Sequence, residues 1–125
     1  MTEPDPSDAV LDAITGLVPV LLHALESLGF AQRHLHPPTL AALVAKIAGH
    51  GTALDAALGP FRAAPWPEPL MAFRQVVEQA SESAVQAFTG LGQAAGAADG
   101  RLVAYRALRH YHAAAETLCR VAPML

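Results

Sequence analysis

The sequence predicts an all-α fold: an antiparallel up-down four-helix bundle whose second helix is broken. Apolar residues recur three and four positions apart over long stretches, which places them on one face of a helix. No useful length of chain alternates between apolar and polar residues, so strands are not expected. Turns rich in proline or glycine divide the 125 residues into four segments of similar length, and short turns favour antiparallel neighbours. One domain, 1–125, is expected, with 1–6 as a flexible tail.

The first helix is expected to run from its N-cap, Ser7, to Leu35. Its predicted inner row is Leu11, Ile14, Val18, Leu21, Leu25, Leu28 and Leu35. Pro19 inside this row costs about 3 kcal/mol. Burial of each leucine contributes about 1.5–3 kcal/mol, so a continuous helix with a kink near Pro19 is expected. His36-Pro37-Pro38 ends it.

The second helix is capped by Thr39 and is expected to break at Gly49–Gly51, because glycine on both sides of His50 removes helical preference. A continuation is expected to reach Phe61, followed by a turn at 62–65.

The third segment, 66–91, has the most regular pattern in the chain. Its predicted inner row is Leu70, Phe73, Val77, Ala80, Ala84, Ala87 and Leu91. Trp66 is expected to pack over Leu70 and Phe61 and so to fix the preceding turn. A loop is expected after Leu91, and Asp99 caps the last helix. The inward residues of that helix are predicted to be Leu108, Tyr111, Ala115, Leu118 and Ala122.

Composition excludes several functional classes. Hydrophobic residues make up 53% and charged residues 15%, which excludes disorder and indicates apolar surface for a partner. A net charge of −3 provides no field for nucleic acid, so no such partner is expected. The single Cys119 and an acidic, proline-rich start indicate a cytoplasmic protein. The longest uncharged apolar stretch, Ala13 to Leu22, is too short to span a membrane.

Catalytic and metal-binding patterns are not found in the sequence, and neither an enzyme, a metal nor a cofactor is expected. His110 and His112 point to opposite faces of a helix, and no Glu-x-x-His pair occurs. Cys119 has no histidine one turn away to activate it and is expected to pack structurally. His112 is expected to be partly buried beside Tyr105.

Basic residues are expected to gather at one end of the bundle, because the first and third turns of this topology lie together. They are Arg33, His34, His36, Arg101, Arg106, Arg109 and His110. Such a positive end can hold a phosphate, a carboxylate or an acidic patch of a partner. The alternative is a solvated basic rim without a ligand.

Three fragments of the sequence are familiar: RHLHPP (33–38), FRAAPWPE (61–68) and YRALRHY (105–111). They resemble the N-terminal helical segment of bacterial predicted esterases of the α/β-hydrolase class, which are carboxylesterase- or phospholipase-like. The resemblance implies an accessory helical domain. It carries over no catalytic residue, because the Gly-x-Ser-x-Gly motif is not present.

Two functions follow from these observations. The first is a non-catalytic interaction or accessory module that self-associates, for example as a homodimer. The second is a bundle that binds a small molecule or lipid in a pocket lined by Phe73, Phe88, Tyr105 and Tyr111. An internal cavity would favour the second, whereas a filled core with an apolar outer face would favour the first.

Overall fold

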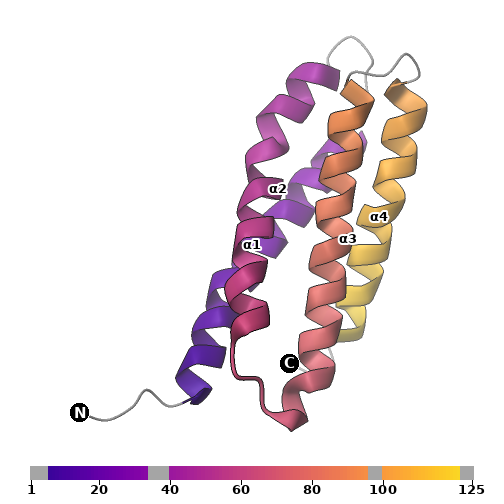
Figure 1. Ribbon diagram of the computed structural model, residues 1–125. Helices are drawn as coiled ribbons and strands as arrows, with labels where there is room; N and C mark the ends of the chain where they lie inside the picture. The colour runs from indigo at the N-terminus through magenta and orange to yellow at the C-terminus, as the bar shows by residue number, and fades with distance from the viewer. Residues whose placement is uncertain (1–5, 34–39, 96–99, 122–125) are drawn as a thin grey trace.

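The computed structural model describes residues 6–33, 40–95 and 100–121, and this part of the chain contains helices and no strand. The helices are α1 (Pro6–Arg33), α2 (Leu40–Ala63), α3 (Met71–Ala95) and α4 (Gly100–Val121). A single 3₁₀ turn, Glu68–Leu70, precedes α3. Consecutive helices run in opposite directions (Figure 1), which confirms the predicted all-α antiparallel bundle.

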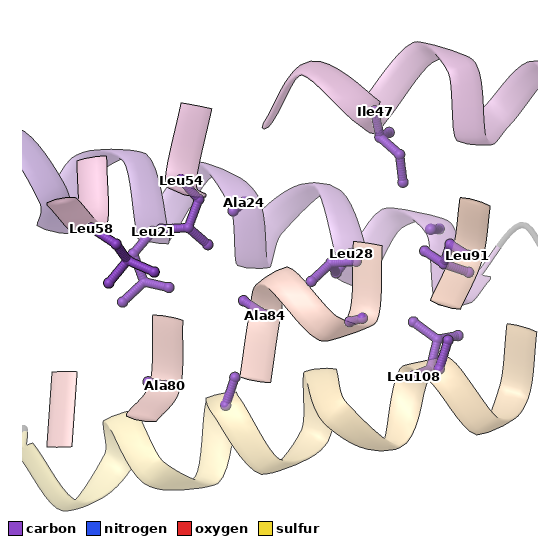
Figure 2. Close-up of a cluster of buried hydrophobic side chains, with 14 of the residues drawn as sticks. Leu21, Ala24, Leu28, Ile47, Leu54, Leu58, Ala80, Ala84, Leu91 and Leu108 are labelled. Carbon is purple, nitrogen blue, oxygen red and sulfur yellow. The ribbon is translucent and has the colours of Figure 1, made fainter. Parts of the chain in front are cut away.

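The four helices do not contribute equally to the packing. α3 and α4 have the most extensive contact, and α2 packs between α1 and α3. α1 runs obliquely to the other three helices (Figure 1) and has much less contact with α3 and α4. Figure 2 shows Leu21, Leu54 and Leu58 pointing toward one another, and Leu91 facing Leu108. The core is therefore a continuous apolar layer to which α1 is attached mainly through α2.

α2 is continuous, so the predicted break at Gly49–Gly51 is wrong. Gly51 is buried, and a Cβ atom there would lie 2.7 Å from Cγ of Phe88 on α3. Glycine costs about 1 kcal/mol in helix propensity, but tertiary packing overrides such a preference. The glycine makes room for an aromatic ring and does not interrupt the helix.

Replacing each of the two glycines with alanine is expected to have opposite effects. At Gly49 nothing lies within 4 Å of an added Cβ, so Gly49→Ala should raise the free energy of unfolding by about 0.5–1 kcal/mol. At Gly51 the methyl group would displace Phe88, and overpacking costs about 1–3 kcal/mol. Urea denaturation should therefore show a net loss for Gly51→Ala. Equal stabilisation by both substitutions would contradict the close contact with Phe88.

α1 passes through Pro19 without a break, as predicted, and the predicted core row is confirmed only at Leu21 and Leu28. The buried residues are Val10, Ala13, Leu17, Leu21, Ala24, Leu28 and Ala31. Leu11 is 60% exposed, and Ile14, Val18 and Leu25 are only half-buried. Three of the buried residues are alanines, whose small side chains let the neighbouring helix approach closely. The predicted Leu35 lies outside the described residues.

The predicted row of α3 is confirmed from Val77 to Leu91, and α3 continues four residues further, to Ala95. Leu70 is 39% exposed and Phe73 is half-buried, because the chain enters α3 through the 3₁₀ turn. In α4 the buried residues are Ala104, Ala107, Leu108 and Ala114. Tyr111, Ala115 and Leu118 are half-buried, whereas Asp99 and Ala122 lie outside the described residues.

Polar and aromatic contacts join the end of α2 to α3. Arg62 donates from Nε to a carboxylate oxygen of Glu78 at 2.9 Å and from Nη2 to a carboxylate oxygen of Glu82. The hydrogen bond to Glu78 has the largest effect and that to Glu82 the next largest, and together they hold the pKa of Arg62 above its ordinary value. Trp66 packs on Phe61 with ring centroids 4.8 Å apart and donates from Nε1 to the Phe61 carbonyl at 2.7 Å. The predicted packing of Trp66 over Phe61 is thus confirmed.

Within the described residues, one helix is long and apolar enough to cross a membrane by length and composition alone: Asp8–Arg33 of α1. The core helix of a soluble protein can meet the same criterion. Asp8–Arg33 is longer than the uncharged stretch from Ala13 to Leu22, and the expectation that the chain does not span a membrane stays a prediction.

Candidate functional site

The four aromatic residues predicted to line one pocket lie in different places. Phe73 contacts Trp66 at the α2–α3 turn, with ring centroids 6.2 Å apart. Phe88 covers Gly51, and Tyr111 lies against Gly29 of α1. Tyr105 is 49% exposed on α4. The structure does not bring these side chains together around a common ligand site.

In the described part of the chain, grooves that are open to solvent lie between neighbouring helices. A groove of about 300 Å³ between α2 and α3 is lined by Phe88 and Gly51, among others. A groove of about 350 Å³ between α1 and α2 contains His23, Lys46 and His50. A further groove, of about 410 Å³, lies between α3 and α4. These are surface grooves, which differ from the enclosed pocket expected of a lipid-binding bundle.

Some of the basic residues predicted to gather at one end of the bundle lie within the described residues. The C-terminal end of α1, with the exposed Arg33, and the N-terminal end of α4 lie at the same end of the bundle (Figure 1). Arg106, Arg109 and His110 are exposed on α4. His34 and His36 lie outside the described residues, and for Arg101 only the helical backbone is described.

The structure divides the basic residues of α4 between two surfaces. Arg106 and His110, one helical turn apart, line the groove between α3 and α4, whereas Arg109 does not. None of the ion pairs found among the described residues involves these three side chains. The groove also contains residues that the sequence did not single out: Gln86, Thr89, Gly90 and Gln93 from α3, with Val103 and Ala107 from α4.

α1 carries a second apolar row beside the one buried in the core. We call this row the outer face of α1; it consists of Leu11, Ile14, Val18, Leu22 and Leu25. Leu11 is 60% exposed and Leu22 is 55% exposed, while the other three are half-buried. Isolated exposed leucines are ordinary, but a contiguous apolar row indicates an interaction surface.

The sulfur and imidazole groups on α4 lie on the surface. Cys119 is exposed, so the expectation that it packs structurally is wrong. His112 is also exposed, and its ring contacts Tyr111 with centroids 5.2 Å apart. Among the described residues, no three His, Cys, Asp or Glu side chains form a group that could hold a metal ion.

Comparisons with protein-family models, with curated proteins and with solved structures each found no match. Function is therefore inferred from the outer face of α1 and from the groove between α3 and α4.

Proposed function

We propose that the chain is a non-catalytic helical interaction module that pairs with a second copy of itself through the outer face of α1. The observation that carries the proposal is that α1 has two apolar rows. Leu17, Leu21 and Leu28 fill the core of the bundle. Ile14 and Leu25 of the outer face pack against this core from its edge, whereas Leu11 and Leu22 remain exposed. Burying each of these large side chains would contribute about 1.5–3 kcal/mol, less where a side chain is already half-buried.

The spacing of the outer face supports a second copy as the partner. From Leu11 to Leu25 the steps are three, four, four and three residues, a pattern that is symmetric about Val18. In an antiparallel pair related by a two-fold axis at Val18, Leu11 of one copy meets Leu25 of the other. Ile14 meets Leu22 in the same way. A two-fold interface requires this self-complementarity, because both copies present the same surface.

The alternative, a bundle that binds a small molecule or lipid inside its core, has less support. Large and small apolar side chains fill the core, with Phe61, Leu17 and Leu54 among the largest that are fully buried. The described hollows are open grooves between helices. A filled core with an apolar outer face is the arrangement expected of an interaction module.

The three fragments that resemble the helical segment of bacterial predicted esterases suggest a setting for this module. As an accessory domain it would bring two catalytic domains together through α1. We propose this setting and a cytoplasmic location in addition to the pairing.

Analytical ultracentrifugation tests the pairing. The unmodified chain is expected to sediment as a dimer, and Leu22→Glu as a monomer. The dissociation constant should rise more than about a hundredfold, because each dimer loses two central leucine contacts and gains two buried charges. Leu102→Glu is the matched control: Leu102 is 51% exposed but lies on α4, so the dimer should persist.

A cysteine at the proposed two-fold axis gives a second readout. In a Cys119→Ser background, Val18→Cys should form a disulfide between the two copies under mild oxidation. Gly16→Cys, exposed on another side of α1, should not. A monomer at millimolar concentration would contradict the proposal. A monomer that floats with phosphatidylcholine vesicles through Leu22 would identify a bilayer as the occupant of this face and overturn the dimer.

A further inference from the structure

We propose that the groove between α3 and α4 binds a small molecule with an anionic group and a short apolar body. The groove has a volume of about 410 Å³, which falls in the range of small-molecule sites. It lies between two helices other than α1, so this site is independent of the proposed pairing. The inference rests on the kinds of side chain that line the groove.

The polar rim of the groove is rich in hydrogen-bond donors. α4 contributes the guanidinium of Arg106 and the ring of His110, and α3 contributes the amides of Gln86 and Gln93. No carboxylate is among the lining residues. Arginine and amide donors suit carboxylate or phosphate oxygens. The rim is therefore complementary to an anion.

The spacing on α4 also favours a bound anion. Arg106 and His110 are four residues apart and so lie on the same side of the helix. The guanidinium of Arg106 and a ring N–H of His110 can therefore both donate to one anion. The nearby carboxylate of Glu82, one turn before Gln86 on α3, is hydrogen-bonded to Arg62 of α2. Glu82 is not among the residues that line the groove, so it does not compete with a bound anion there.

The floor of the groove is apolar and closely packed. A Cβ atom on Gly90 would lie 2.5 Å from Cβ of Ala107, so the two helices are in near contact at this point. Val103 and Ala107 add apolar surface beside the donors. Such a floor accepts a ring or a short alkyl chain next to the anionic group. Inorganic phosphate has no such apolar part.

Isothermal titration calorimetry with phenyl phosphate tests the site, with benzoate and inorganic phosphate as comparison ligands. Phenyl phosphate or benzoate should bind more tightly than inorganic phosphate, and whichever of the two binds more tightly identifies the anionic group. Arg106→Gln should weaken binding about tenfold or more, because it removes a charge-assisted contact, and His110→Ala should weaken binding because it removes a ring N–H donor. Arg109→Gln is the matched control, since it removes the same charge from α4 outside the groove.

The variant Gln93→Glu provides a further check, because it places a carboxylate in the groove at an exposed position where folding should be unaffected. It should abolish binding, with an unchanged circular dichroism spectrum. Two results would overturn the proposal. One is no heat of binding for phenyl phosphate and benzoate at millimolar concentration. The other is equal weakening by Arg106→Gln and Arg109→Gln, which would indicate a general effect of net charge.

Discussion

Phe61→Ala is expected to lower the free energy of unfolding by about 3–5 kcal/mol. Phe61 is fully buried at the end of α2 and packs against Trp66, so alanine would leave a cavity and remove an aromatic contact. Domains of this size have a total stability of about 5–15 kcal/mol, so the loss would be a large fraction of it. Urea denaturation followed by circular dichroism measures the change.

Phe30→Ala is the control for this effect. Phe30 is 42% exposed on α1, so the same change in side chain should cost much less. Fluorescence of the single tryptophan, Trp66, gives a second signal. Trp66 contacts Phe61, so its emission should change in Phe61→Ala, whereas Phe30 is far from it along the chain. If both variants lost the same stability, Phe61 would not be the buried anchor of the α2–α3 turn.

Gly90→Val is expected to destabilise the bundle by about 1–3 kcal/mol or more. Even a single added Cβ atom would lie 2.5 Å from Cβ of Ala107 and 3.3 Å from its Cα atom. A backbone atom cannot move aside by rotating, so α3 and α4 would have to separate along their most extensive contact. Thermal or urea denaturation should show the loss.

Gly92→Val serves as the control two residues away on the same helix. Nothing lies within 4 Å of a Cβ atom at Gly92, so this variant should be as stable as the original chain or slightly more stable. A loss as large as that of Gly90→Val would mean that valine is tolerated poorly in α3 as such. The close approach of the two helices would then not be the cause.

The fold could be predicted because apolar spacing fixes which segments are helical, but it could not fix which face of α1 is buried. α1 has two neighbouring apolar rows with the same spacing, and the predicted row mixes them: Leu21 and Leu28 belong to the buried row, whereas Leu11, Ile14, Val18 and Leu25 belong to the outer face. The structure buries the row containing Ala13, Ala24 and Ala31, since close helix approach depends on small residues. Similarly, the role of Gly51 depends on Phe88, which lies 37 positions along the chain and on another helix.

The basic residues of the groove were predicted as members of a larger cluster, but the groove itself was not. Arg106 and His110 belong to it and Arg109 does not, and this division depends on how α4 is rotated against α3. Gln86 and Gln93 gave no signal, because glutamine is common on the exposed side of any helix. Only the pairing of two particular helices turns these four side chains into one site.

The small buried residues of α3 and α4 also constrain how this sequence can diverge. The buried alanines of α3 are Ala80, Ala84, Ala87 and Ala94, and those of α4 are Ala104, Ala107 and Ala114. A larger side chain at any of these positions overpacks the core, and glycine weakens the helix. Neutral change is thus confined to coupled substitutions in which a gain of volume on one helix accompanies a loss on the other. Homologous chains should therefore show correlated residue sizes among these buried positions.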